Sequence, residues 1–184
     1  MTLKIIGGTF KSRLLKSPRG ATTRPSAAML REALFNICQA QVPGATFLDL
    51  FAGSGAVGLE ALSRGATHAY FVEKERHAAQ CIRENIATLQ VQEQATLYHT
   101  DYRVALEKME QKGMQFDLVF VDPPYDVEMG PILKGVVQHK ILKGTSLLFA
   151  EQRFSKEPPY SSSQLICLES RRFGDAVLLQ YIHS

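Results

Sequence analysis

The residues of this chain that are best suited to chemistry are Asp122, Pro123, Pro124 and Tyr125, which directly follow the apolar run 116–121. Two successive prolines restrict the backbone φ angle and carry no N–H group, so the segment presents carbonyl acceptors beside the Asp122 carboxylate. The carboxylate of Asp122 and the carbonyl of Pro123 can accept both hydrogens of an exocyclic base amino group and aim its lone pair at a methyl donor. Tyr125 can stack on the base. The segment predicts methyl transfer to a base nitrogen.

A rigid turn without a ligand is the alternative interpretation of these four residues. The chain contains its own comparison, because Glu157-Pro158-Pro159-Tyr160 ends in the same three residues. That second copy follows no apolar strand, has Glu in place of Asp and lies beside a run of serines, so we interpret it as a loop. The apolar strand before Asp122 favours the functional interpretation of the first copy.

A glycine-rich loop, Gly53-Ser54-Gly55-Ala56-Val57-Gly58, follows the apolar run 47–51 and has the pattern G-x-G-x-x-G. Glycines let the backbone turn sharply and approach a ligand closely. Glu73 lies 20 residues beyond Gly53 at the end of the next predicted strand, where a carboxylate can accept hydrogen bonds from both hydroxyls of a ribose. The combination predicts an adenosine-containing cofactor. A tight turn without a ligand and the dinucleotide-binding fold share the same glycine pattern.

The residues in front of the glycines favour S-adenosylmethionine over a nicotinamide dinucleotide. Asp49 and Phe51 place a carboxylate and an aromatic ring just before Gly53. Asp49 would repel a pyrophosphate, whereas it would attract the ammonium and sulfonium groups of S-adenosylmethionine. Asp101, after the third predicted strand, is a candidate acceptor for the adenine amino group and a candidate cap for the helix that follows.

Apolar, strand-like runs alternate with helical patterns through the middle of the chain. The predicted strands are 47–51, 69–73, 95–99, 116–121 and 146–150, and the predicted helices lie at about 57–64, 75–89 and 102–111, with one more between the last two strands. Near-continuous apolar strands separated by helices imply a parallel sheet that is covered on both faces. Ligands bind at the carboxyl ends of the strands in such a sheet, so the Asp122 corner and the glycine loop should face one crevice.

The end of the chain departs from this alternation. Residues 164–168 and 176–181 flank Arg171-Arg172-Phe173-Gly174-Asp175 and predict an antiparallel hairpin that joins the edge of the sheet. We therefore predict an α/β fold with a mostly parallel seven-stranded sheet, helices on both faces and a C-terminal antiparallel hairpin. Residues 1–40, with a small hairpin and a helix, would form a basic appendage to a main domain over 41–184.

Positive charge is concentrated at the start of the chain. Residues 1–31 contain seven basic residues and no acidic one, whereas the rest of the chain has 14 basic and 18 acidic residues. A cationic arm on a mildly acidic body favours a polyanionic partner that is held through its phosphates. A solvated basic end without a partner is the alternative. The basic residues of this arm are Lys4, Lys11, Arg13, Lys16, Arg19, Arg24 and Arg31.

The composition excludes several classes of protein. Hydrophobic residues make up 45% and charged residues 21% of the 184 residues, which is typical of a folded domain. No run approaches the roughly 20 apolar residues that span a bilayer, and the first residues lack the apolar core of a secretory signal. The cysteines Cys38, Cys81 and Cys167 lack metal-ligand spacing. We therefore expect reduced thiols, no bound metal, no membrane contact and a cytoplasmic protein.

The pattern Asp-x-Phe-x-Gly-x-Gly at 49–55, together with Asp-Pro-Pro-Tyr at 122–125, resembles amino-group methyltransferases that act on nucleic-acid bases. More narrowly, the chain resembles the bacterial RsmD-type enzymes from about residue 3 to the C-terminal hairpin. The segments that carry this likeness are Ile5-Ile6-Gly7-Gly8, Arg24-Pro25, Arg31-Glu32-Ala33-Leu34-Phe35-Asn36 and residues 51–65 and 119–125. The resemblance implies a Rossmann-like class I methyltransferase that uses S-adenosylmethionine. Its target would be N2 of guanine 966 in 16S rRNA, within the small ribosomal subunit or its assembly intermediate.

The resemblance also implies roles for individual residues. The cofactor-binding set is Asp49, Phe51, Ala52, Gly53, Ser54, Gly55, Glu73, Asp101 and Tyr102. The catalytic set is Asp122, Pro123 and Tyr125, and the substrate-binding set is Lys11, Arg13, Arg24, Arg31 and Pro124. The chain departs from the family at Ser26-Ala27-Ala28-Met29-Leu30, where many members have a run similar to Thr-Thr-Asp-Arg-Val. That departure removes polar side chains from a segment that could contact the substrate.

Two other interpretations stay open from the sequence. A DNA adenine-N6 or cytosine-N4 methyltransferase shares both motifs, but 184 residues leave no room for a separate domain that reads DNA. A NAD-type dinucleotide-binding domain, or a module that binds a nucleotide without chemistry, shares the glycine pattern but leaves the Asp122 corner without a role. We expect a monomer.

Overall fold

The computed structural model describes residues 3–18, 25–155 and 159–183. Within this part of the chain, a seven-stranded sheet has the strand order β3-β2-β1-β4-β5-β7-β6. Strands β1 to β5 pair in parallel, whereas β7 pairs antiparallel with both β5 and β6. The strands are β1 (Thr46–Asp49), β2 (His68–Val72), β3 (Ala95–Tyr98), β4 (Phe116–Val121), β5 (Leu142–Arg153), β6 (Leu165–Phe173) and β7 (Ala176–His183).

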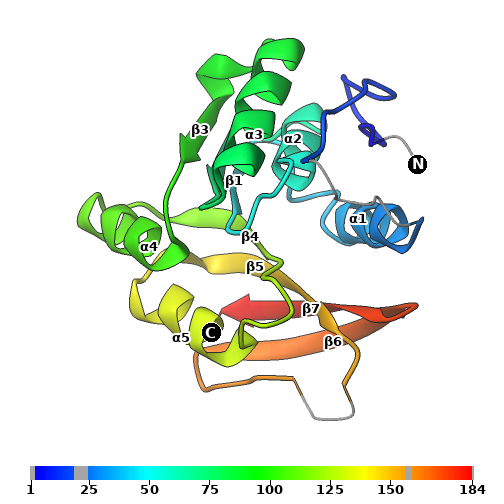
Figure 1. Ribbon diagram of the computed structural model, residues 1–184. Coiled ribbons are helices and arrows are strands. Elements are labelled where there is room, and N and C mark those ends of the chain that lie inside the picture. Colours follow the sequence, from blue (N-terminus) through cyan, green and yellow to red (C-terminus); the bar gives the residue numbers. More distant parts are fainter. Residues whose placement is uncertain (1–2, 19–24, 156–158, 184) are drawn as a thin grey trace.

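Helices cover both faces of the sheet, with α4 and α5 on one side and α1 and α2 on the other (Figure 1). Apolar residues of α1, α2 and α3 form one buried cluster with Phe120 and Phe149, and those of α4 and α5 form another with Val121. Both clusters draw on the same strands because successive strand residues face opposite sides. No helix in the described ranges has the length and hydrophobicity needed to cross a bilayer. The helices are α1 (Pro25–Ile37), α2 (Ala56–Ser63), α3 (Arg76–Leu89), α4 (Tyr102–Gln111), α5 (Met129–Gln138) and the 3₁₀ turn η1 (Gln92–Gln94).

The predicted fold class is confirmed, because the mostly parallel sheet, the two helical layers and the antiparallel C-terminal pair are all present. Three strands are longer than predicted, β7 by two residues and β5 and β6 by more. β5 begins four residues before the predicted start, since Leu142 pairs with Phe116 across an irregularity in the register. β6 continues to Phe173, so only Gly174 and Asp175 form the hairpin turn. Strand pairing, which local sequence patterns do not reveal, lengthens these elements.

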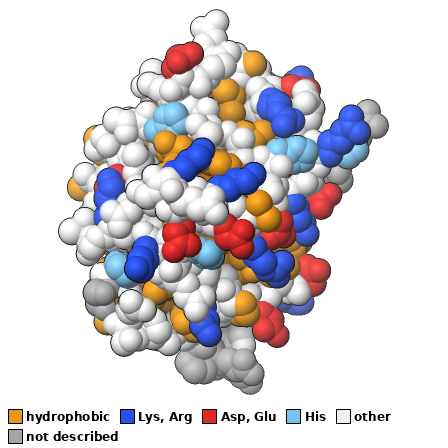
Figure 2. All heavy atoms as spheres, turned by 90° about the vertical axis from the view of Figure 1, so that its left-hand side faces the viewer, with side chains coloured by type: hydrophobic (Ala, Val, Ile, Leu, Met, Phe, Trp, Pro, Cys, Tyr) orange, Lys and Arg blue, Asp and Glu red, His pale blue; other side chains and the backbone are white. Residues whose placement is uncertain are grey.

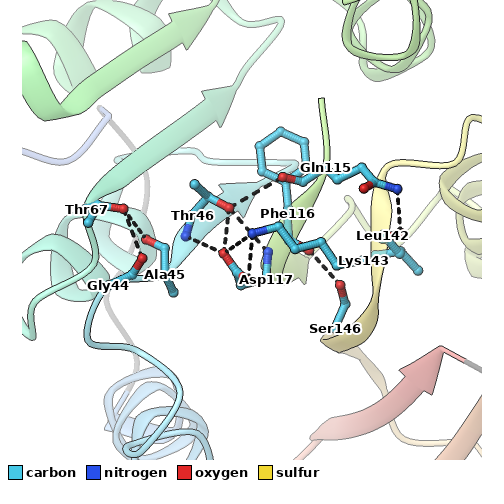
Figure 3. Close-up of polar contacts among 10 residues, drawn as sticks. All are labelled: Gly44, Ala45, Thr46, Thr67, Gln115, Phe116, Asp117, Leu142, Lys143 and Ser146. Atoms are coloured by element: carbon cyan, nitrogen blue, oxygen red, sulfur yellow. Dashed lines mark hydrogen bonds and ion pairs between the residues drawn. The ribbon is translucent and has the colours of Figure 1, made fainter. Parts of the chain in front are cut away.

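A polar network joins the amino-terminal ends of β1, β4 and β5 (Figure 3). Asp117 Oδ2 accepts hydrogen bonds from the backbone N and the hydroxyl Oγ1 of Thr46, both at 2.8 Å. Lys143 Nζ lies 2.8 Å from each carboxylate oxygen of Asp117, and Ser146 Oγ donates to Phe116 O at 2.6 Å. These contacts hold the register of the three strands, and the register determines which residues lie side by side at their carboxyl ends.

The N-terminal segment attaches to α2 through a buried carboxylate. Ile6 N and Gly7 N donate to the two carboxylate oxygens of Glu60 at 2.8 and 2.7 Å. Arg64 Nε donates to Glu60 Oε1 at 2.8 Å, and Arg31 Nε lies 3.8 Å from Glu60 Oε2. Glu60 is fully buried. A buried charge of this kind is tolerated only while its partners are in place.

Close backbone contact explains the glycines of the same segment. Lys4 and Leu14 form an isolated antiparallel bridge, so the predicted N-terminal hairpin is present as a minimal pairing. Gly8 has a φ angle of +76°, and a Cβ atom at this position would lie 1.8 Å from Ser63 O at the end of α2. Only glycine allows the chain to pass this close.

The division into an appendage over residues 1–40 and a main domain over 41–184 stays a prediction. Ile5 and Leu34 belong to the same core cluster as Phe47 of β1. The N-terminal section therefore contributes to the core on one face of the sheet.

Glu60→Ala should destabilise the protein by about 3 kcal/mol, because it leaves buried guanidinium groups and two backbone N–H groups without their acceptor. Urea unfolding measures the change in the free energy of unfolding. Glu84→Ala is the control, because Glu84 makes an exposed ion pair with Lys16 and should leave stability nearly unchanged. Equal effects of the two substitutions would contradict the role of Glu60.

Candidate active site

The carboxyl ends of the five parallel strands meet at one edge of the sheet, and each strand brings an acidic residue to it. Asp49 ends β1, Glu73 follows β2 directly and Asp122 follows β4 directly. Asp101 lies three residues beyond β3. Glu151 lies in β5, immediately after the last residue that pairs with β4. Ligands bind at this edge in open α/β sheets.

A first cavity of about 500 Å³ opens at this edge, within the size range of small-molecule sites. Nine of the site residues that the sequence predicts line this cavity. They are Phe51, Gly53, Glu73, Asp101, Tyr102, Asp122, Pro123, Pro124 and Tyr125. The cavity therefore contains the whole predicted catalytic set and most of the predicted cofactor set.

A second cavity of about 700 Å³ adjoins the first on the side of the N-terminal segment and α1. Phe51, Gly53 and Asp122 line both cavities. The remaining nominated residues that line the second cavity are Asp49, Ala52, Ser54 and Arg31. The two cavities are therefore neighbours, and Asp122 belongs to the lining of both.

The glycine loop is shaped by one strained position and one close approach. Gly55 caps α2 in the left-handed conformation, with a φ angle of +77°. A Cβ atom on Gly58 would lie 2.4 Å from the ring of Phe71, so only glycine lets α2 lie this close to β2. Asp49 Oδ2 accepts from Gly58 N at 3.0 Å. Asp49 therefore supports the start of α2 from beneath the loop.

Glu73 and Asp101 are oriented by backbone N–H groups. Glu73 accepts from Gly53 N at 2.8 Å and from Glu75 N at 2.7 Å, one with each oxygen. Asp101 caps α4 by accepting from Arg103 N at 2.9 Å, as the sequence predicted. A carboxylate has further lone pairs beyond those used here, so each can also accept from a ligand.

The aromatic wall of the first cavity is formed by two side chains whose rings are tilted by 45° to each other. The rings of Phe51 and Tyr102 lie 5.2 Å apart, and Tyr102 is buried. This pair gives the cavity an apolar surface between Glu73 and Asp101, which suits a planar base whose edge forms polar contacts.

Burial and neighbouring charges make the ionised forms of Asp49 and Asp122 unfavourable. Burial raises the pKa of Asp49 to about 7, and the charge of Glu73 adds to the increase, while the hydrogen bond from Gly58 N opposes it. Burial also raises the pKa of Asp122 well above its usual range, and the charges of Glu151 and Asp49 raise it further. A cationic ligand would relieve this repulsion.

The charge of this edge distinguishes between the candidate cofactors. S-adenosylmethionine carries a sulfonium and an ammonium group, which the clustered carboxylates Asp49, Asp122 and Glu151 would attract. The pyrophosphate of a dinucleotide would add two negative charges to the same cluster. The negative charge of these carboxylates therefore fits S-adenosylmethionine and does not fit NAD.

The Asp122 corner differs in one respect from the arrangement that the sequence suggested. The Pro124 carbonyl accepts from Val127 N at 2.9 Å and closes a turn, so it does not point outward as a free acceptor. Within the described residues, neither the Asp122 carboxylate nor the Pro123 carbonyl accepts a hydrogen bond. Tyr125 is 61% exposed. Two acceptors and one exposed ring are therefore available to a ligand at this corner.

The nominated substrate-binding residues are dispersed. Lys11 and Arg13 are exposed, and Arg13 Nη2 donates to Thr88 O at 3.2 Å. Arg31 is buried beside Glu60, and its Nη2 donates to Lys4 O at 2.7 Å. Arg24 lies outside the described residues. The substrate roles of these four side chains stay predictions.

Sequence reasoning missed two residues that shape the site. Glu151 lines both cavities at the end of β5, and the signal that could have identified it is an acidic residue after each of the other parallel strands. Asn85 of α3 donates to Ser54 O and to Lys16 O, both at 2.9 Å, and so joins the glycine loop to the N-terminal segment. No local pattern marks Asn85, because its partners lie far away in the sequence.

A protein-family model described as "Conserved hypothetical protein 95" matches residues 3–182 of this chain. The chain belongs to this family. The recognised RsmD-type family, the class I methyltransferase fold and the cofactor class, S-adenosylmethionine, are thereby confirmed.

Relatives in this RsmD-type family cover most of the chain. "Putative rRNA methyltransferase YlbH" of Bacillus subtilis (strain 168) is 32% identical over 173 residues, 94% of each chain. "Ribosomal RNA small subunit methyltransferase D" of Escherichia coli (strain K12) is 41% identical over 123 residues, 67% of this chain and 60% of that one. The solved structure "Putative methyltransferase yhhF from Escherichia coli" has a TM-score of 0.89 at 31% identity and covers 100% of this chain and 99% of that chain.

Asp49→Asn should raise the free energy of unfolding of the ligand-free protein at pH 8 and raise it by less at pH 5. Because the pKa of Asp49 is about 7 in the folded protein and ordinarily 3.8, the folded protein binds more protons than the unfolded chain between these values. The contribution of Asp49 to stability therefore falls as pH rises through this window. We expect a gain above ~1 kcal/mol at pH 8, measured by urea unfolding. If the free energies of unfolding of the variant and the parent differ by the same amount at both pH values, the raised pKa of Asp49 is contradicted.

Proposed function

We propose that this protein transfers a methyl group from S-adenosylmethionine to the exocyclic N2 of a guanine in 16S rRNA, of the guanine 966 type. The observation that carries the proposal is the Asp122 corner, where the Asp122 carboxylate and the Pro123 carbonyl lie at the first cavity without a donor from the described chain. Two acceptors at this point match the two hydrogens of a base amino group.

The cofactor would occupy the first cavity and extend toward the second. Glu73 would accept from the ribose hydroxyls, while Asp101, Tyr102 and Phe51 would hold the adenine. Asp49 and the loop residues Ala52, Gly53, Ser54 and Gly55 would surround the methionine portion. The cofactor supplies an activated methyl group on a sulfonium.

The chain's own residues then orient the amine and receive its proton. The Asp122 carboxylate and the Pro123 carbonyl accept one N–H each, which directs the nitrogen lone pair toward the methyl group. The carbon–nitrogen bond forms as the carbon–sulfur bond breaks, and positive charge develops on the nitrogen beside Asp122. Because the pKa of Asp122 is raised, this carboxylate is also able to take the proton that the nitrogen loses.

Two side chains would hold the base outside its stack. Tyr125 is exposed at the mouth of the site, where its ring can stack on an extruded base. Pro124 lies beside it and would complete the apolar contact. Stacking offsets part of the free energy that extrusion costs.

Ribosomal RNA as the substrate is supported by the names of the relatives in Bacillus subtilis and Escherichia coli. The exposed basic residues Lys11 and Arg13, with Arg24, would contact its phosphates, and the buried Arg31 would meet a nucleotide only inside the second cavity, which it lines. The substrate would be 16S rRNA in the small ribosomal subunit or its assembly intermediate, encountered in the cytoplasm by a monomer.

Asp122→Asn should lower kcat by roughly 100-fold or more, because the amide cannot accept the proton and carries no negative charge. The assay uses labelled cofactor and small subunits that lack the modification, and mass spectrometry identifies the methylated nucleoside as N2-methylguanosine. Cofactor Kd should change by less than about threefold. Asp126→Asn, an exposed carboxylate four residues away, is the matched control. Full activity of Asp122→Asn would refute the mechanism.

The double substitution Lys11→Gln and Arg13→Gln should reduce the slope of log K against log salt concentration for RNA binding by about 1 to 1.5, because each lost phosphate contact removes about 0.7 from the slope on a single strand. Filter binding across a salt series measures the slope. The control replaces Lys108 and Lys134 by Gln. These exposed residues lie on α4 and α5, whose face carries interspersed positive and negative side chains (Figure 2). An equal loss of slope in both proteins would exclude a specific role for the arm.

A further inference from the structure

Glu151 occupies the position next to Asp122 on the neighbouring strand. Val121 of β4 pairs with Ala150 of β5 in the parallel register, so Asp122 and Glu151 follow at the same level. Adjacent strands lie about 4.8 Å apart. Phe120 and Phe149 pair one step earlier and belong to the core cluster beneath α1, α2 and α3. Because side chains alternate, the two carboxylates project toward that same side.

Glu151 also lies at the meeting point of the cavities around the corner. It lines the first and second cavities together with Asp122. It also lines two smaller cavities, of about 460 and 400 Å³, on either side of Tyr125. Glu151 is half-buried and lies close enough to Asp122 for its charge to contribute to the raised pKa of that carboxyl. A base that stacks on Tyr125 with its amino group on Asp122 would place its adjacent ring nitrogen near Glu151.

The ring nitrogen next to the amino group distinguishes the three bases that carry one. In guanine, the N2 amino group lies between N3, an acceptor, and N1, which bears a hydrogen and is a donor. In adenine, N1 next to the N6 amino group is an acceptor, and in cytosine so is N3 next to the N4 amino group. Asp122 and Pro123 satisfy only the amino group, which all three bases share. Asp122 and Pro123 therefore cannot distinguish guanine from adenine or cytosine.

We propose that Glu151 makes this choice by accepting a hydrogen bond from guanine N1–H. This inference rests on the proposed function and adds the residue that determines its base specificity. Adenine or cytosine in the same pose would turn a ring lone pair toward the Glu151 carboxylate, and a buried acceptor that faces another acceptor strongly disfavours binding. With guanine, the two neighbouring carboxylates both meet N–H donors, which reduces their mutual repulsion.

The test compares guanine with 2-aminopurine, which keeps the 2-amino group but has an acceptor at N1. Small subunits are reconstituted with 16S rRNA that carries one or the other base at the target position. The parent protein should prefer guanine by about 100-fold or more in kcat/KM. Glu151→Gln should reduce this preference at least tenfold, because its amide can donate to N1 of 2-aminopurine. Loss of the O6 group in 2-aminopurine affects both proteins equally and cancels in the comparison.

Glu128→Gln is the matched control, because this exposed carboxylate lines one of the smaller cavities away from Asp122, and it should keep the parent's preference. Cofactor Kd should match the parent's in Glu128→Gln, and it is measured in Glu151→Gln so that weaker cofactor binding is separated from the preference between the two bases. If Glu151→Gln turns over too slowly, the ratio of Kd values for the two particles replaces the ratio of kcat/KM.

An unchanged preference in Glu151→Gln, or a parent protein that uses both bases equally, overturns the assignment of Glu151. Failure of the proposed function gives a different result, namely no N2-methylguanosine from the parent protein on guanine-containing particles. The two ideas can therefore fail separately.

Discussion

Five parallel strands deliver a carboxylate each to one edge of the sheet, and the rest of the site depends on how that negative charge is balanced. Asp49, Glu73, Asp101, Asp122 and Glu151 come from segments spread over about a hundred residues, yet parallel pairing brings their strand ends together. Concentrated negative charge in a partly buried space is unfavourable without compensation. The edge therefore favours a cationic ligand, and the sulfonium and ammonium groups of the family's cofactor meet that requirement.

The chain balances part of this charge with its own backbone. Asp49 is held by Gly58 N, Glu73 by Gly53 N and Glu75 N, and Asp101 by Arg103 N. These carboxylates shape the glycine loop and the start of α4 before any ligand is present. Asp122 differs, because no donor within the described ranges reaches it. The asymmetry separates a set of carboxylates that the backbone already satisfies from one that stays available to a ligand.

Much of this arrangement could be predicted because its signals are local. The glycine pattern, the acidic residue after β2 and the cap at Asp101 each depend on a few neighbouring residues, and their place at one edge follows from strand direction alone. The extra length of β5 and β6, the turned carbonyl of Pro124 and the burial of Arg31 could not be predicted in this way. The Pro124 carbonyl is turned by a local bond from Val127 N, three residues away, whereas the other features depend on partners that are distant in sequence, such as Phe116 for Leu142 or Glu60 for Arg31.

The sequence by itself determined the family and the fold class and predicted a chemistry for the Asp122 corner, because backbone restriction by glycine and proline acts within a few residues. Only the tertiary structure decided that Glu151 stands beside Asp122 and that Glu60 joins the N-terminal segment to α2. Both contacts result from strand register and helix packing, in which many weak long-range interactions act together. Such long-range interactions leave no local pattern in a single sequence.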